Sequence, residues 1–260
     1  MPTITRDGVR IAFTEAGSGS QSMLLLHGMA CERSHMLPAL RHFESRFRCV
    51  AIDIRGHGES DKPVDWYAMD DFLADVDHVI GELGLGKPIL VGHSFGGSIS
   101  LAYVDRYPDR ATALVMLDSG MRSNAEINQD LGPFYDALRS GDPARYAATL
   151  DAFVRSRLVD PVDGESFAAE IAALMASVPS HVFLAMSQTV QTLRSADMAA
   201  RCTIPALLVL SRQSFADPAS LAALGPNWHV GRAVGAGHFV QLVVPAQVHA
   251  MMDRFLELEL

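Results

Sequence analysis

The sequence has little of what marks a disulfide-linked, zinc-binding or nucleic-acid-binding protein. Its 260 residues include only three cysteines, Cys31, Cys49 and Cys202, and no CxxC pair. An odd number at wide spacing predicts reduced thiols rather than a disulfide framework or a zinc site. Basic residues are also scarce, since 21 Lys and Arg stand against 30 Asp and Glu, for a net charge of −9. We therefore expect no nucleic acid and no anionic membrane as partner, because phosphate binding needs clustered positive charge.

Long hydrophobic stretches are absent as well. No run of about 18 apolar residues occurs, so we expect no membrane-spanning helix. The opening stretch MPTITRDGVR lacks the apolar core of a signal peptide. These absences predict a cytoplasmic protein whose partner is a small-molecule substrate. The oligomeric state stays open, with a homodimer as one option.

What the chain does contain is a series of short apolar runs that alternate with amphipathic stretches. Residues 3–16 alternate around Asp7 and Gly8, which indicates a hairpin turn. Further strands are predicted at 23–26, 48–54, 88–92, 113–117, 204–210 and 229–234. Helices are predicted at 69–83, 98–107 and 244–258. Strands that alternate with helices predict an α/β protein with a mostly parallel sheet covered on both faces.

One long segment interrupts this alternation. From 122 to 201 we find helix-like stretches rich in Ala, Met, Leu and Phe, and no clear strand. We interpret this segment as a helical cap, inserted into a core formed by residues 1–121 and 202–260. The alternative is that it is additional scaffold. A cap is favoured because helical segments inserted in this way often shape a pocket and exclude water from it.

A nucleophile motif follows the strand predicted at 88–92. Residues 92–96 read GHSFG and match G-x-S-x-G, with Ser94 at the centre and an amphipathic helix after it. The motif requires small flanking residues because the backbone makes a sharp turn between strand and helix. This strand–turn–helix setting predicts that Ser94 is a nucleophile.

A serine hydroxyl reacts slowly unless a base lies within hydrogen-bond reach. The candidate is His238, in the glycine-rich stretch GAGHF at 235–239. That loop follows the last predicted strand and precedes the last helix. Its position makes His238 the best candidate among ten histidines, although a plain surface histidine is the alternative.

Four motifs in this order give the chain a family resemblance. They are HG at 27–28, DxRGxGxS at 53–60, GHSFGG at 92–97 and GH at 237–238. Together they resemble the α/β-hydrolase fold superfamily, and within it serine hydrolases of the esterase and lactonase type. The resemblance implies an eight-stranded, mostly parallel sheet flanked by helices, with the helical cap inserted after the sixth strand. The superfamily supports many chemistries, so function must be argued from the site.

The resemblance also implies an oxyanion hole, the pair of backbone N–H groups that stabilises the negative oxygen. One comes from the residue after the nucleophile and one from the loop after the third strand. By position these residues are Phe95 and Met29. The loop departs from the commoner HGxxG pattern, since Cys31 stands where a second glycine often occurs.

The acid that would orient His238 has two candidates. Relatives usually carry it after the seventh strand, but there the chain has Ser211 and Ser214, with Asp217 three residues further on. Asp217 could instead cap the following helix. Asp118 ends the run at 113–117, and some branches, including certain haloalkane dehalogenases, place the acid after the sixth strand. We favour Asp118, with Asp217 as the alternative and neither as the remaining option.

The cap region supplies candidates for the substrate pocket. The candidate lining residues share a bulky apolar side chain: Met121, Phe134, Phe183, Met186 and Phe239. Met and aromatic residues at helical spacing also fit a plain core. No HExxH, Walker A or Rossmann pattern occurs, so we expect no metal, nucleotide, flavin or other cofactor.

These observations predict a serine hydrolase that cleaves a small hydrophobic carboxylic ester or lactone through an acyl-enzyme on Ser94. A serine in this position argues against haloalkane dehalogenase or epoxide hydrolase, which need a carboxylate nucleophile. The alternative is a cofactor-independent dioxygenase of a 3-hydroxy-4-quinolone-type substrate, with the His238–Asp118 pair as base. The chain resembles that group at 211–217. It departs from that group at two positions, where it has Phe95 and Met29. A non-catalytic receptor on the same scaffold is a third hypothesis.

Overall fold

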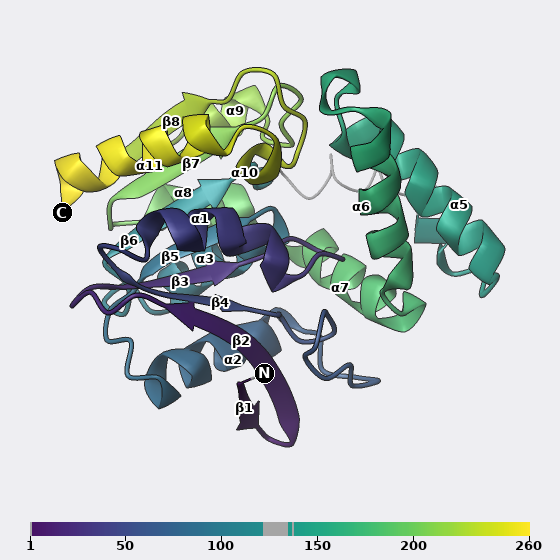
Figure 1. The fold of residues 1–260 in the computed structure, drawn as a ribbon, viewed down its shortest axis with the longest axis horizontal. Helices are drawn as coiled ribbons and strands as arrows, with labels where there is room; N and C mark the ends of the chain where they lie inside the picture. Colours follow the sequence, from purple (N-terminus) through teal and green to yellow (C-terminus); the bar gives the residue numbers. More distant parts are fainter. Residues whose placement is uncertain (1, 122–134, 137) are drawn as a thin grey trace.

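The computed structural model describes residues 2–121, 135, 136 and 138–260 (Figure 1). In this part of the chain eight strands form one sheet, in the order β1-β2-β4-β3-β5-β6-β7-β8. Pairing is antiparallel from β1 to β2 and from β2 to β4, and parallel between all other neighbours. The strands are β1 Thr3–Arg6, β2 Val9–Ala16, β3 Ser22–Leu26, β4 Arg48–Ile52, β5 Ile89–His93, β6 Ala113–Leu117, β7 Ala206–Leu210 and β8 Trp228–Arg232. The mostly parallel sheet predicted from the sequence is confirmed.

The hairpin at the amino end forms where its turn residues predict it. Asp7 and Gly8 both have positive φ, 49° and 83°, and Arg6 pairs with Val9 across the turn. Two consecutive positive φ values are typical of a type I′ turn, whose twist matches that of the flanking strands. The turn thus fixes the register of the sheet's antiparallel edge.

Helices cover both faces of the sheet. Successive side chains of β3 point to opposite faces, so Met23 and Leu25 belong to one buried cluster and Leu24 and Leu26 to another. The first cluster contains residues of α1 (Leu37–Phe43) and α11 (Pro245–Glu259), and the second contains residues of α2 (Met69–Glu82) and α3 (Phe95–Arg106). The sheet is therefore buried on both sides, as parallel sheets generally are.

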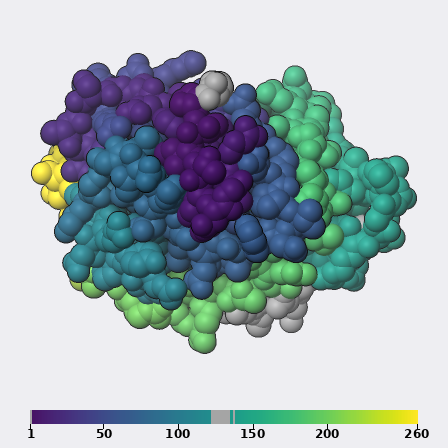
Figure 2. Space-filling model, turned by 90° about the horizontal axis from the view of Figure 1, so that it is seen from below, coloured from purple at the N-terminus to yellow at the C-terminus, as the bar shows by residue number. Residues whose placement is uncertain are grey.

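Between β6 and β7 the described chain is helical. This segment contains α5 Pro143–Phe153, η2 Val154–Leu158, η3 Pro161–Asp163, α6 Glu165–Ser177, α7 Ser180–Thr192 and α8 Ser195–Arg201. Figure 1 shows α5, α6 and α7 beyond the carboxyl ends of the strands, and in Figure 2 their teal and green residues form one end of the molecule. By contrast, α8 packs against α3 beside the sheet. The division into a core and a cap at 122–201 stays a prediction.

Short elements complete the fold: η1 Arg33–Met36, α9 Pro218–Ala222 and α10 Val240–Val243. Among the residues the structure describes, no single helix is long and apolar enough to cross a membrane, although α6 and α7, bent by 97°, pass that test as a pair.

Candidate active site

Ser94 stands on the tight bend that joins β5 to α3. Its φ of 51° and ψ of −117° lie in a region that L-residues rarely adopt. The Ser94 N–H donates to the Leu117 carbonyl of the neighbouring strand at 2.9 Å, which secures the bend. Strained backbone of this kind persists only where the surrounding structure determines it, and it places the Ser94 side chain at the carboxyl edge of the sheet.

The glycines of the GHSFGG motif are required by close backbone packing. A methyl group on Gly92 would collide with the backbone of Gly96, and one on Gly96 would collide with the Leu26 carbonyl. A methyl group on Gly97 would meet the Ser119 hydroxyl. The sequence pattern therefore reflects the lack of space around the bend.

His238 is held by Asp118 on its side away from the cavity. The His238 Nδ1 atom lies 2.7 Å from Asp118 Oδ2, and the other carboxylate oxygen accepts the Ser211 N–H at 2.7 Å. Asp118 is fully buried at the end of β6. Because the carboxylate only accepts, the proton of the neutral imidazole belongs on Nδ1, and Nε2 is left free to take a proton.

Asp217 lies elsewhere. Its carboxylate accepts the Ser220 N–H at 2.8 Å and so caps the amino end of α9. This is the capping alternative that the sequence left open. Of the two candidate acids, the structure thus brings only Asp118 to His238.

Ser94 and His238 line the same cavity. The Ser94 hydroxyl makes no hydrogen bond to another described residue, and catalytic hydrogen bonds are often long until substrate is bound. The imidazole of His238 meets the Phe215 ring edge-on, with centroids 5.1 Å apart. Phe215, which the sequence did not single out, therefore limits how far that imidazole can turn.

His93 supports the loop that carries His238. Its Nε2 atom lies 3.0 Å from the His238 carbonyl and donates to it, while its Nδ1 atom has no partner among the described residues. Burial lowers the pKa of His93 well below its ordinary value, so the ring is neutral. A neutral His93 adds no positive charge beside His238.

The two predicted oxyanion residues, Met29 and Phe95, both line the cavity. Neither backbone N–H has an acceptor among the described residues. The adjoining Ala30 N–H is bound instead by His57 Nε2 at 3.0 Å, and Ala30 has a φ of 55°. Burial lowers the pKa of His57 to about 4, which keeps the ring neutral and able to accept. The loop after β3 is thereby fixed. The backbone N–H groups of Met29, in that loop, and of Phe95, next to Ser94, both remain unpaired.

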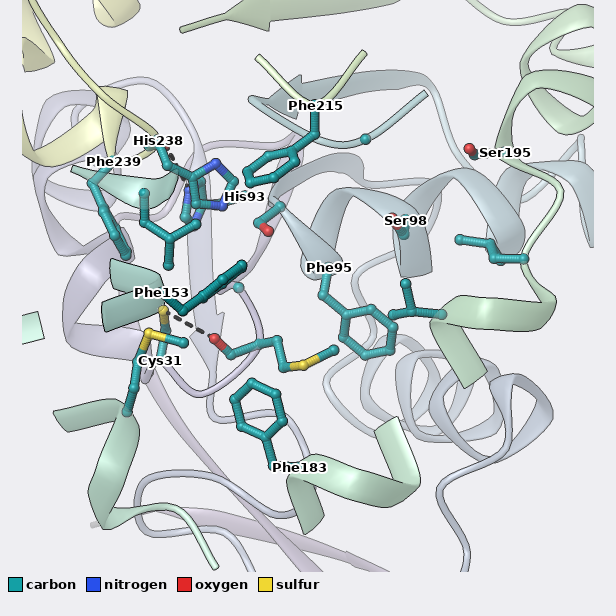
Figure 3. Close-up of a pocket in the computed structure, with 18 of the residues that line it drawn as sticks. Cys31, His93, Phe95, Ser98, Phe153, Phe183, Ser195, Phe215, His238 and Phe239 are labelled. Carbon is teal, nitrogen blue, oxygen red and sulfur yellow. Dashed lines mark hydrogen bonds between the residues drawn. The ribbon is translucent and has the colours of Figure 1, made fainter. Parts of the chain in front are cut away.

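The cavity has a volume of about 150 Å³ (Figure 3). Of the five residues predicted to line it, Phe183 and Phe239 do so. Met121 and Met186 are fully buried but are not among its lining residues. Phe134 lies outside the described residues. Helical spacing correctly indicated buried side chains but could not show which of them face the cavity.

Several lining residues had no signal in the sequence: Cys31, Ser98, Tyr135, Phe153, Leu158, Met175, Val190, Leu193, Ser195 and Phe215. They come from the loop after β3, from α3, from the helical segment and from the loop after β7, which no local pattern connects. Burial raises the pKa of the Cys31 thiol to about 12, so it stays protonated and contributes to the wall as a weakly polar group. Among the described residues, no group of three or more His, Cys, Asp or Glu is arranged to hold a metal ion.

Comparison with known proteins matches the chain to one fold family. The family model described as the alpha/beta hydrolase fold matches residues 21–245. A 2-(acetamidomethylene)succinate hydrolase of Mesorhizobium japonicum is 30% identical over 262 residues, covering 94% of this chain and 90% of that protein. Epoxide hydrolase 4 of Mus musculus is 36% identical over 118 residues, only 44% of this chain and 33% of that protein.

Solved structures agree on the fold. The structure titled "Est816 as an N-Acyl homoserine lactone degrading enzyme" has a TM-score of 0.84 at 23% identity, and the two chains cover each other to 98% and 100%. The enol-lactonase of Burkholderia xenovorans LB400 has a TM-score of 0.83 at 18% identity, with 98% of this chain and 100% of that one covered. At these identities the likeness shows the shared architecture alone.

Proposed function

The chain belongs to the α/β-hydrolase fold family and is a hydrolase, and on that premise we propose that it cleaves a small hydrophobic carboxylic ester or lactone through an acyl-enzyme on Ser94. The observation that carries the proposal is the 2.7 Å contact of His238 Nδ1 with the buried Asp118 carboxylate, beside a serine on a strained bend. A base oriented in this way next to a hydroxyl is the arrangement that acyl transfer requires.

The reaction divides into two steps. In the first, Ser94 Oγ attacks the carbonyl carbon, His238 Nε2 takes the hydroxyl proton, and the Met29 and Phe95 amides receive the oxygen as it becomes negative. His238 then returns the proton to the leaving alcohol, whose bond to the acyl carbon breaks. In the second step water attacks the acyl-enzyme, with the same base and amides, and releases the acid. Asp118 stabilises the imidazolium formed in each step without itself taking the proton.

The size and lining of the cavity support a small apolar substrate. A volume of about 150 Å³ compares with an engineered apolar cavity of similar size that binds benzene. Its wall is formed largely by aromatic and aliphatic side chains, among them Phe153, Phe183 and Leu193. Such a wall favours an acyl group or ring of a few carbons over a long chain or an ion.

The chemistry of the nucleophile separates this proposal from epoxide opening. Epoxide hydrolases match less than half of the chain, and their alkyl-enzyme ester needs a carboxylate where this chain has Ser94. The dioxygenase alternative stays a prediction, which oxygen uptake with a 3-hydroxy-4-quinolone would test beside the ester assay.

A fluorophosphonate probe and a panel of chromogenic esters test the proposal directly. We expect the probe to label the wild type and the Ser177→Ala control, whose serine is exposed at the end of α6, but not Ser94→Ala. Ester cleavage should follow the same pattern. Labelling that persists in Ser94→Ala, or a wild type that neither reacts with the probe nor cleaves an ester or lactone, would refute the proposal.

A further inference from the structure

Ser98 places a second hydroxyl in the cavity, one helical turn beyond Ser94. Its backbone N–H donates to the carbonyl of Ser94, the residue just before α3, at 3.1 Å. Ser98 is only 7% exposed and lines the cavity. Its hydroxyl has no hydrogen-bond partner among the described residues, unlike that of Ser100 on the same helix, which donates to the Gly96 carbonyl at 2.8 Å.

The surroundings of Ser98 are otherwise mostly apolar. Figure 3 shows Ser98 and Ser195 on the side of the cavity opposite His238 and Phe239, and the Phe95 ring on the same side as Ser98. Val190 and Leu193 also line the cavity. Unlike the fully buried Ser119 and Ser211 hydroxyls, which also lack a partner, the Ser98 hydroxyl keeps accessible surface, so it can meet what occupies the cavity. What enters the cavity is therefore the available source of a partner for Ser98.

The first turn of α3 limits the distance between the two serines. The Ser98 N–H donates to the Ser94 carbonyl, which places the two Cα atoms about 6 Å apart. Ser94 itself is not helical, but both residues line the same cavity. The acyl carbon bonds to Ser94 Oγ, so a substituent on the second carbon beyond the carbonyl lies a few ångströms further into this cavity. That substituent is within reach of Ser98.

We propose that Ser98 is a specificity-determining residue that hydrogen-bonds a neutral oxygen at carbon 3 of the acyl group, so that the preferred substrates are 3-hydroxyacyl or 3-oxoacyl esters. The inference rests on the proposed function, since it assumes an acyl group on Ser94. A serine hydroxyl both donates and accepts, so it fits an alcohol as well as a ketone. No Lys or Arg is among the cavity-lining residues that the structure describes, which favours a neutral oxygen over a carboxylate.

Three 4-nitrophenyl esters with the same number of acyl carbons test this inference: butyrate, 3-hydroxybutyrate and 2-hydroxybutyrate. We expect the wild type to have a kcat/KM about 2- to 13-fold higher for 3-hydroxybutyrate than for butyrate, the range of one net hydrogen bond. The 2-hydroxy ester should show no such advantage, because its oxygen lies too close to Ser94. In Ser98→Ala the ratio of 3-hydroxybutyrate to butyrate should fall to about one, and Ser98→Thr, which keeps a hydroxyl, should retain the preference.

The possible outcomes separate this inference from the proposed function. A wild type that cleaves butyrate without preferring the 3-hydroxy ester overturns the inference and leaves the function standing. So does a Ser98→Ala variant in which both esters slow by the same factor, since a purely structural role would act in that way. If the fluorophosphonate probe and all three esters fail to react, the proposed function fails and the inference falls with it.

Discussion

Asp118 and His238 are 120 positions apart in the chain, yet 2.7 Å separates Asp118 Oδ2 from His238 Nδ1. The sheet order explains the approach, because Asp118 follows β6 and His238 follows β8, with β7 between them. Ser211, just after β7, donates its N–H to the second oxygen of Asp118. Three consecutive strands thus end in one hydrogen-bonded group, which holds the imidazole in a fixed orientation.

Replacing the two candidate acids by amides should have very different effects. Asp118→Asn keeps the shape of the side chain but presents an NH₂ donor and a neutral acceptor to His238 Nδ1. The imidazole then has no negative charge beside it, and its proton is no longer fixed on Nδ1. We expect kcat to fall by roughly 10³- to 10⁴-fold. Asp217→Asn should change kcat less than about twofold, because Asn also caps helices. Steady-state kinetics on an ester that the wild type cleaves gives both values, and the opposite ranking would overturn the assignment of the acid.

Asp163 of the helical segment should act as a positioning residue for His238. Its carboxylate accepts the Gly237 N–H at 3.1 and 3.2 Å, and the Leu158 carbonyl accepts the His238 N–H at 2.7 Å. We expect Asp163→Ala to lower kcat about 3- to 10-fold with little change in KM, since the loop loses a hydrogen bond to a charged group. Glu165→Gln, which removes an equal charge from an exposed pair with Arg155, is the matched control. Equal effects of the two variants would argue against this role.

Two glycine-to-alanine changes should affect different properties: Gly237→Ala should lower the rate, and Gly81→Ala should raise the stability of the fold. A methyl group on Gly237 would meet the Leu158 carbonyl and the Asp163 carboxylate, so Gly237→Ala must displace the His238 loop. A shift of about 1 Å at such a position can cost roughly 10²-fold in rate. Gly81 lies in α2 with nothing within 4 Å of the added methyl group, so Gly81→Ala should stabilise the fold by about 0.5–1 kcal/mol. Thermal unfolding and ester kinetics on both variants check the contrast.

His249 should make stability depend on pH at a distance from the cavity. Burial lowers its pKa from 6.5 to about 4, with a further contribution from His42, whose ring stacks on it at 4.3 Å, while Asp253 acts in the opposite direction. Between these pKa values the unfolded chain binds a proton that the folded chain does not. The free energy of unfolding therefore decreases as pH falls through this window.

The variant His249→Leu removes that proton from both states. Its free energy of unfolding should depend on pH less steeply than that of the wild type, by up to about 1.4 kcal/mol per pH unit between about pH 6.5 and pH 4. Urea unfolding at a series of pH values measures both slopes. Parallel curves for the two proteins would show that His249 does not titrate in this way.

Much of the fold was predictable because local patterns determine it. The five apolar residues at 113–117 form β6 with the predicted bounds, and the pair Asp7–Gly8 forms the predicted turn. The alternation of short strands and helices predicts a parallel sheet on physical grounds. The individual strands and the strand-free helical segment at 122–201 were predicted from these patterns, and the family resemblance implied the count of eight strands and the insertion after the sixth.

The site was predictable only in part. Sequence motifs indicated Ser94 and His238, and strand position indicated Asp118, because these residues lie at the ends of recognisable strands. The cavity wall was not predictable, since Met186 and Phe183 have the same apolar character and neighbouring positions on α7, but only Phe183 lines the cavity. Contacts such as Gly237 with Asp163 join distant segments, and no local pattern encodes them.

The helical segment leaves the sheet from β6 and returns to it at β7, and these two strands are neighbours. Because the two strands are parallel, β6 ends at the carboxyl edge of the sheet and β7 begins at the amino edge, so the segment's two ends lie at opposite edges. The segment must therefore carry the chain back along the sheet to the start of β7, which α8 does while it packs against α3. The proposed reacting groups follow the strands, but the segment that forms much of the cavity wall also holds the His238 loop through Leu158 and Asp163. A different segment grafted between residues 121 and 202 would therefore change the orientation of His238 together with substrate selection, unless it kept these two contacts.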